Sequence, residues 1–213
     1  MRVLIVKLSS LGDVVHAMPV VHDIRSAHPD ACIDWVVVPA LAPLLGEMRG
    51  LHEVIGCPVR EWRRGWWRSD VRAGMRRLRA RLQEHPYDAI LDLQGLTKSA
   101  LVARLARGVR YGLANRTEGA SHEWPARWLA DRPVRIEPHI HALDRSRELV
   151  ARALGYRVSG PPDFGLAGMT PDSPMQAERA TASSDGAGRP STETWCRWPC
   201  AGCGPVRHAV GKL

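Results

Sequence analysis

The sequence of 213 residues lacks any long apolar run. Its first apolar run, residues 3–6, ends at Lys7, which is too short for the core of a signal peptide or for a membrane span. We therefore expect no export signal, and the cytoplasm is the default location. The motifs G-x-x-x-x-G-K-[ST] and G-x-G-x-x-G are also missing, which argues against a Walker phosphate loop and a dinucleotide-binding fingerprint.

The sequence has only five cysteines, an odd number that cannot all pair in disulfides within one chain. Cys32 and Cys57 stand alone in apolar surroundings, which favours reduced core thiols over disulfides. The other three form a C-x3-C-x2-C motif from Cys196, with His208 nearby. This spacing is typical of some iron–sulfur enzymes, but only ten residues follow it, and the apolar residues that a zinc knuckle needs are missing. We predict no metal site.

Positive charge exceeds negative charge, giving a formal net charge of +8 and an isoelectric point of about 9.8. This balance points to a polyanionic partner: nucleic acid, an anionic membrane face or a phosphorylated substrate. Hydrophobic residues make up 45% of the chain and charged residues 24%, so a globular core is expected.

Apolar patterning predicts strands that alternate with helices. The strands are expected at residues 2–7, 33–38, 53–56, 87–93 and 109–112. The helices are expected at residues 14–27, 71–83, 96–106 and 142–154, the last closed by Gly155. This alternation predicts an α/β fold with a doubly wound, Rossmann-like parallel sheet.

The composition changes after about Leu166. From residue 167 to the end, the only Val, Ile or Leu residues are Val206, Val210 and Leu213, and no period of 2 or 3.6 is present. Such a segment cannot bury enough apolar surface to offset its ordering entropy. We expect one domain over residues 1–166 and an irregular tail over 167–213. A flexible tail and a shifted reading frame both explain the change, and we favour the shifted frame.

The turn after the first strand carries a lysine, two hydroxyls and a carboxylate: Lys7, Ser9, Ser10 and Asp13. Ligands of open α/β sheets bind beyond the carboxyl ends of the strands, where this segment lies. Asp13 has two interpretations. It is either a first-turn acid that complements the helix dipole, or a general base that takes a proton from an incoming hydroxyl.

Basic residues gather among tryptophans in residues 60–68 and continue along the helix expected at 71–83. Arg60, Arg63 and Arg64 suit a polyanion site, since the guanidinium group pairs bidentately with phosphate or carboxylate. The alternative is a solvated basic helix anchored to the core by tryptophans, which we favour for the arginines from Arg72 to Arg81.

A second strand-to-helix turn lies at residues 92–99. Its Gln94 and Lys98 would face the same crevice as Asp13 if the two strands are close in the sheet. The alternative is an ordinary turn built around Gly95, which composition alone favours.

The chain opens with MRVLIVKLSSLGDVVHAMP, residues 1–19. This segment resembles the start of type I lipopolysaccharide heptosyltransferases, in which V-K-x-S-S-x-G-D-V joins a strand to a helix. The resemblance continues in order through residues 34–37, 60–66, 87–90, 92–100, 141–147 and 153–156. It therefore spans roughly residues 1–166, with several separate motifs in one register.

The resemblance implies the N-terminal, acceptor-binding half of a GT-B glycosyltransferase. This half would hold Kdo-modified lipid A, peripherally at the cytoplasmic face of the inner membrane, and a second half would hold ADP-heptose. Asp13 aligns with the residue regarded as the catalytic base of an inverting heptose transfer. The expected acceptor-binding residues are Lys7, Ser9, Ser10, Arg60, Arg63, Arg64, Gln94 and Lys98.

The sequence departs from the family pattern at three places. Glu61 stands where relatives often carry a basic residue, and His122 stands where an acceptor-binding arginine is common. Nothing after Leu166 resembles the donor half. We therefore expect this half to bind no cofactor and no sugar nucleotide, and the chain to be truncated and inactive alone. The alternative function is a non-catalytic basic module that binds anionic membrane or nucleic acid through Arg60–Arg81. The cluster around Asp13 favours the enzyme, without a nucleic-acid partner.

Overall fold

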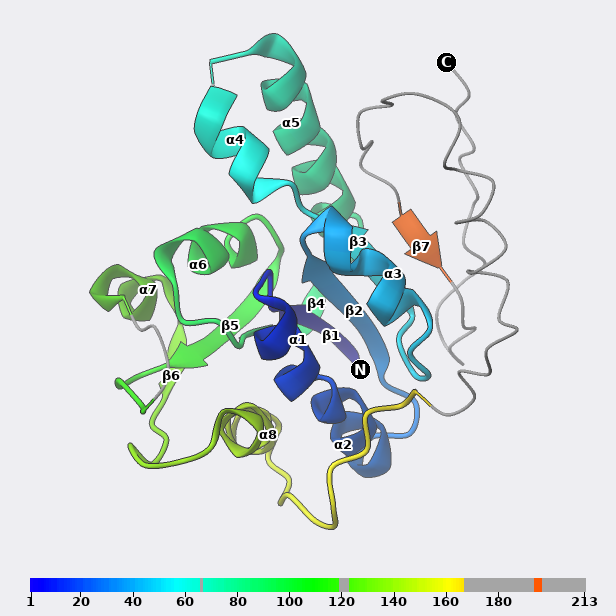
Figure 1. Cartoon of the computed structure of the whole chain (residues 1–213), viewed down its shortest axis with the longest axis vertical. Helices are drawn as coiled ribbons and strands as arrows, with labels where there is room; N and C mark the ends of the chain where they lie inside the picture. The colour runs from blue at the N-terminus through cyan, green and yellow to red at the C-terminus, as the bar shows by residue number, and fades with distance from the viewer. Residues whose placement is uncertain (66, 119–122, 167–193, 197–213) are drawn as a thin grey trace.

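The computed structural model describes residues 1–65, 67–118, 123–166 and 194–196. They form an α/β fold in which helices cover both faces of a sheet ordered β6-β5-β4-β1-β2-β3-β7 (Figure 1). The strands are β1 (Arg2–Val6), β2 (Cys32–Val37), β3 (Glu53–Gly56), β4 (Tyr87–Asp92), β5 (Gly108–Leu113), β6 (Arg132–Val134) and β7 (Thr194–Cys196). The helices are α1 (Leu11–Ala17), α2 (Pro19–Ala27), the 3-10 turn η1 (Pro39–Leu41), α3 (Ala42–Gly46), α4 (Val59–Gly65), α5 (Ser69–Gln83), α6 (Thr97–Ala103), α7 (Trp124–Leu129) and α8 (Ala142–Leu154).

The central strand β1 is apolar on both of its faces, because helices cover the sheet from both sides. Val3 and Ile5 pack in a core with residues of α1, α2, α3 and α8. Leu4 and Val6 pack in a second core with residues of α4, α5 and α6. The molecule therefore has three layers, with a hydrophobic core on each side of the sheet.

The winding of the sheet reverses beside β1. The chain runs outward from β1 through β2 to β3, and then returns to place β4 on the other side of β1. Ligands of doubly wound sheets bind at such a switch point, outside the carboxyl ends of the strands. Here that place is formed by the turn after β1 and the turn after β4, two of the three segments in which site residues were expected.

The predicted fold class is confirmed, since β1 to β6 pair in parallel as a Rossmann-like sheet. The single helix expected at 14–27 is two helices, because Pro19 begins α2 and cannot continue the hydrogen bonding of α1. Gly155 closes α8 in the left-handed conformation, as predicted. The short elements α3, α4, α7 and β6 were not predicted.

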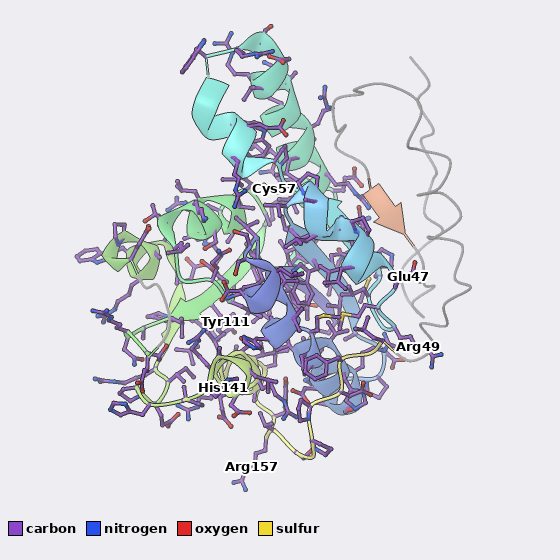
Figure 2. The ribbon with its side chains drawn as sticks, viewed as in Figure 1. Glu47, Arg49, Cys57, Tyr111, His141 and Arg157 are labelled. Carbon is purple, nitrogen blue, oxygen red and sulfur yellow. The ribbon has the colours of Figure 1, made fainter. Side chains whose placement is uncertain are left out.

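The two cysteines expected in the core are buried thiols. Cys57 lies where β3 leads into α4, at the base of the α4–α5 hairpin (Figure 2). Burial raises the pKa of its thiol to about 12. A thiol with so high a pKa stays protonated at neutral pH, so Cys57 behaves as a core side chain rather than a nucleophile.

The described part of the C-terminal segment is β7, which pairs antiparallel with β3. It is a regular element within the segment expected to be irregular. The rest of residues 167–213, including Cys200, Cys203 and His208, lies outside the described residues. Within the described residues, no helix has the length and apolar character to cross a bilayer.

Candidate active site

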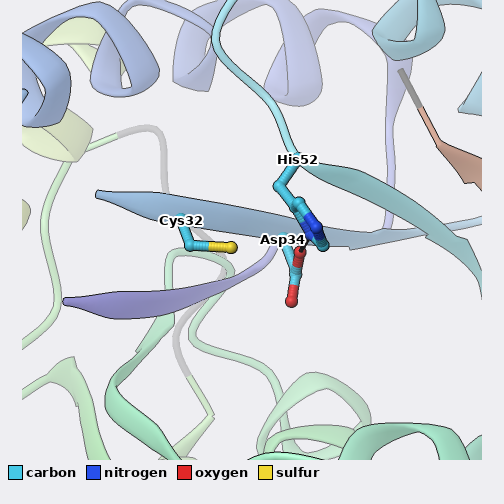
Figure 3. A group of neighbouring side chains, drawn as sticks. All are labelled: Cys32, Asp34 and His52. Atoms are coloured by element: carbon cyan, nitrogen blue, oxygen red, sulfur yellow. Dashed lines mark hydrogen bonds and ion pairs between the residues drawn. The ribbon is translucent and has the colours of Figure 1, made fainter. Parts of the chain in front are cut away.

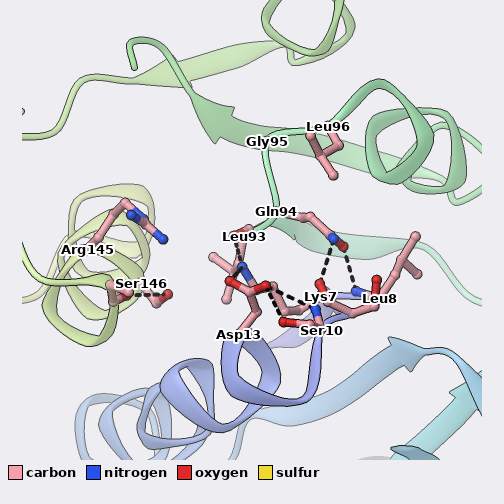
Figure 4. A network of polar contacts seen from close by, with 12 residues as sticks. Lys7, Leu8, Ser10, Asp13, Leu93, Gln94, Gly95, Leu96, Arg145 and Ser146 are labelled. Atoms are coloured by element: carbon pink, nitrogen blue, oxygen red, sulfur yellow. Dashed lines mark hydrogen bonds and ion pairs between the residues drawn. The ribbon is translucent and has the colours of Figure 1, made fainter. Parts of the chain in front are cut away.

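Lys7 and Asp13 meet where β1 ends and α1 begins (Figure 4). The Lys7 Nζ lies 3.6 Å from the Asp13 carboxylate and donates a hydrogen bond of 2.9 Å to the carbonyl of Leu93. Asp13 also accepts hydrogen bonds from the backbone N–H and the hydroxyl of Ser10, at 3.0 and 2.9 Å. Lys7 is buried, whereas the Asp13 side chain is 40% exposed. The carboxylate is therefore held in place and still reachable by a ligand.

The electrostatic surroundings keep Asp13 ionised. Burial raises its pKa, but the hydrogen bonds from Ser10 and the positive charge of Lys7 outweigh burial, so the pKa lies below its ordinary value. Burial lowers the pKa of Lys7, and the Asp13 carboxylate acts against this shift. Both interpretations of Asp13 fit this geometry, because it caps α1 through Ser10 and is also a reachable proton acceptor.

Gln94 joins the turn after β4 to the turn after β1. Its Oε1 accepts a hydrogen bond of 2.9 Å from the backbone N–H of Leu8, and its Nε2 donates one of 2.6 Å to the carbonyl of Ser9. Both ends of the amide therefore hold the loop that leads to Asp13. A positioning role follows from these contacts, and the predicted contact of Gln94 with an acceptor stays a prediction.

Asp92 holds the turn that carries Gln94. Its carboxylate accepts hydrogen bonds from the backbone N–H groups of Gln94 and Gly95 and from the hydroxyl of Ser99. Burial raises the pKa of Asp92 to about 6, although these hydrogen bonds act in the opposite direction. The polar turn at 92–95 is thus fixed from within.

The other predicted site residues lie on different elements. Arg60 is exposed on α4, and Lys98 is half-buried on α6. Arg63 and Arg64 belong to α4, but their side chains lie outside the described part of the structure. The structure thus brings together Lys7, Ser9, Ser10, Asp13 and Gln94, and the predicted roles of the arginines and Lys98 stay predictions.

The sequence analysis gave no role to Arg145. This residue lies in the first turn of α8 and is buried, with 4% of its surface exposed. Its side chain points from α8 toward Lys7 and Asp13 (Figure 4). Arg145 is separated from Asp13 by more than half of the chain, so only the fold shows that they are close. The one signal in the sequence was that Arg145 lies one helical turn before Leu149, on the apolar side of the helix expected at 142–154.

The exposed arginines of the basic segment are fewer than the sequence suggests. Arg81 forms an ion pair with the buried Glu53, and Arg68 forms one with Asp70. The arginines that α5 exposes are Arg72, Arg76, Arg77 and Arg79. Trp67, just before α5, is 59% exposed. The basic face is therefore smaller than Arg60–Arg81.

A second buried polar cluster lies at the opposite, amino-terminal edge of the sheet (Figure 3). Cys32, Asp34 and His52 place one potential metal ligand each within 4.8 Å of one another. However, Asp34 already accepts hydrogen bonds from His52 at 2.7 Å, from Tyr87 at 2.9 Å and from Arg2 at 3.1 Å. Burial raises the pKa of Asp34, but these partners outweigh burial and leave it below its ordinary value. The cluster is accounted for as a charge network that stabilises this edge.

Comparison with known proteins identifies the family. Residues 75–190, more than half of the chain, match the model of glycosyltransferase family 9 (heptosyltransferase), so the match extends past residue 166. The chain is 41% identical over 157 residues to lipopolysaccharide heptosyltransferase 1 of Escherichia coli K12, and the match covers 73% of this chain and 48% of that protein. It is 35% identical over 167 residues to the Pseudomonas aeruginosa protein of the same name, covering 78% and 46% of the two chains.

Solved structures agree in fold. The E. coli heptosyltransferase WaaC with ADP-2-deoxy-2-fluoro heptose matches with a TM-score of 0.72 and 38% identity, over 78% of this chain and 53% of that one. E. coli ADP-heptose lps heptosyltransferase II matches with a TM-score of 0.56 and 20% identity, over 89% and 53% of the two chains, which shows likeness of fold alone. The chain spans about half the length of the curated relatives it matches. By its sequence and its sheet, the chain belongs to glycosyltransferase family 9, the heptosyltransferases.

Proposed function

We propose that this chain is the acceptor-binding half of a heptosyltransferase that transfers heptose from ADP-heptose to Kdo-modified lipid A. The observation that carries the proposal is the ionised, reachable carboxylate of Asp13 at the switch point of the sheet, 3.6 Å from the buried Lys7. Membership of the heptosyltransferase family and the likeness to lipopolysaccharide heptosyltransferase 1 support this substrate class.

The proposed reaction is an inverting displacement. Asp13 takes the proton of an acceptor hydroxyl, and the oxygen attacks the anomeric carbon of heptose from the face opposite the diphosphate. A new carbon–oxygen bond forms while the bond to the diphosphate breaks, and its electron pair leaves with ADP. Lys7 keeps Asp13 ionised before the reaction, and Ser10 fixes the direction in which the carboxylate points.

The donor is proposed to bind elsewhere than in residues 1–166. The matched relatives are about twice as long as their match to this chain, which leaves room for a separate donor half. In this proposal, a second half must face the carboxyl edge of the sheet before the transfer can occur.

We also propose that the protein works on the cytoplasmic face of the inner membrane. The support is the row of exposed arginines on α5, together with the exposed Trp67 at its start. Electrostatic attraction between arginines and an anionic lipid surface favours binding, and tryptophan side chains prefer the interface between water and lipid. Arg60 on the neighbouring α4 would extend the same basic face.

Acceptor recognition is testable with the chain as it is. Binding of Kdo-bearing lipid A and of lipid A without Kdo is measured by isothermal titration calorimetry in the same detergent. The proposal expects the Kdo-bearing form to bind at least about tenfold more tightly, since charged groups of Kdo would pair with buried cations. Addition of ADP-heptose should give no transfer above a reaction without protein. Equal affinity for both lipids would contradict acceptor recognition, and turnover would contradict the need for a second half.

A further inference from the structure

Arg145 is a buried cation whose hydrogen-bond partners among the described residues are neutral. Its Nη1 donates hydrogen bonds of 3.3 Å to the hydroxyl of Thr117 and 3.2 Å to the carbonyl of Glu118. Within residues 1–65, 67–118 and 123–166, no carboxylate forms an ion pair with Arg145. Two positions later, Arg147 is also buried, but it pairs with Asp23 through two hydrogen bonds of 2.7 and 2.8 Å. The fold thus neutralises one of these arginines and leaves the other facing the site.

The charge of Arg145 acts on the candidate active site. Burial lowers the pKa of Arg145, and the Asp13 carboxylate partly offsets this. In turn, the positive charge of Arg145 adds to the lowering of the Lys7 pKa. Two buried cations therefore face one half-exposed carboxylate. Asp92 lies nearby as well, but its carboxylate already accepts three hydrogen bonds, from Gln94, Gly95 and Ser99.

Burying a cation that forms no ion pair costs folding free energy. Such a cost is expected at a binding site, where a negatively charged ligand pairs with the cation. The ligand would have to enter beside Asp13, because this carboxylate is the exposed member of the cluster. A planar guanidinium group recognises a carboxylate through two parallel N–H donors, and among the described residues Nη1 is the only guanidinium nitrogen of Arg145 that donates a hydrogen bond.

We propose that Arg145, with Lys7 beside it, forms an anion subsite that binds the carboxylate of a sugar-acid acceptor and thereby brings a hydroxyl of the same sugar to Asp13. This inference rests on the proposed function and adds to it a specificity-determining residue. In this proposal the carboxylate pairs with the two cations, and the sugar ring lies over the exposed side of Asp13.

The test compares a charged ligand with its neutral form. The chain is titrated with free Kdo and with the methyl ester of Kdo, whose carboxylate is masked. For the wild-type chain, the acid should bind about tenfold to hundredfold more tightly than the ester. Arg145→Gln should bring this ratio close to one, and Arg145→Lys should keep part of it. The matched control is Arg152→Gln, on the same helix, whose side chain is 40% exposed and which should keep the wild-type ratio.

The outcomes separate the inference from the proposed function. If the wild-type chain binds acid and ester equally, or if Arg145→Gln keeps the wild-type ratio, the subsite is refuted while Kdo recognition stands. If inorganic phosphate displaces the acid at equal concentration, the assignment to a carboxylate is wrong. Failure of the wild-type chain to bind either ligand contradicts the proposed function itself. Circular dichroism of each variant reports its folding, and the comparison of acid with ester in the wild-type chain decides even where a variant unfolds.

Discussion

The two edges of the sheet bury charge in different ways. At the amino-terminal edge, Asp34 is completely enclosed and accepts hydrogen bonds from Arg2, His52 and Tyr87. At the carboxyl edge, Asp13 stays 40% exposed, and the buried Arg145 has only neutral hydrogen-bond partners among the described residues. The charges at the amino-terminal edge are paired within the protein, whereas at the carboxyl edge, among the described residues, Arg145 forms no ion pair and Asp13 is partly exposed.

The contrast shows that burial of polar groups alone does not mark a site. Cys32, Asp34 and His52 are close enough to hold a metal ion, yet the hydrogen bonds of Asp34 account for its position. The site is instead marked by a charge that the fold has positioned but not neutralised. The same criterion separates Arg147, which is paired with Asp23, from Arg145.

The largest expected effect on stability lies at the amino-terminal edge. Asp34→Asn removes the charge that balances Arg2, and loss of one partner of a buried ion pair costs about 3–5 kcal/mol. Asp13→Asn should cost less than about 1 kcal/mol, because the pair that it forms with Lys7 is partly exposed to water. Urea denaturation of both variants measures the two free energies of unfolding. Similar costs for the two variants would remove the distinction between the edges.

A smaller effect depends on pH and concerns Asp92. Its pKa is about 6 in the folded protein against an ordinary value of 3.8, so folding takes up a proton between these values. The wild-type protein therefore loses stability as the pH rises from about 4 to about 6, and the loss is complete above that range. Asp92→Asn cannot ionise, so its stability relative to wild type should rise by about 2 kcal/mol between pH 4 and pH 8. Thermal unfolding across this range measures the difference, and a constant difference would show that Asp92 has an ordinary pKa.

The smallest effect concerns the basic face of α5. Arg76→Gln should weaken binding to anionic lipid vesicles about fivefold, because each arginine near such a surface contributes about 1 kcal/mol. Arg157→Gln is the matched control, since Arg157 is exposed at the opposite end of the molecule from α5 (Figure 2). Co-sedimentation at low salt compares the two variants. Equal weakening would mean that net charge, rather than this face, binds the lipid.

Local patterns in the sequence predicted the sheet and the segment from Lys7 to Asp13. The apolar strands β1 to β4 and the polar turns after β1 and β4 are local features, so they could be recognised. Short elements such as α4 and α7 have too few residues to show a period. The closeness of Arg145 to Asp13 and the two hydrogen bonds of Gln94 depend on contacts between distant segments, which no local pattern contains.

The choice between the two interpretations of Asp13, helix cap or general base, also depends on contacts that the local sequence does not contain. A first-turn acid after a serine predicts a helix cap, and the structure contains that cap. The position of the carboxylate beside Lys7, at the switch point of the sheet, is what supports the proposed second role as general base. The cap and the base are therefore not exclusive, and an experiment has to remove one without the other.

The most direct test replaces Asp13 by Asn in a chain completed with a donor half from a relative. The exchange keeps the shape of the side chain and an oxygen that can accept from Ser10, but it removes the base. Asp144→Asn, a first-turn acid of α8, serves as the matched control for the helix dipole. We expect Asp13→Asn to lower heptose turnover by about 10²–10⁴-fold with acceptor KM nearly unchanged, and Asp144→Asn to keep turnover near wild type. Near-normal turnover of Asp13→Asn would show that Asp13 is a helix cap and would contradict its role as the general base.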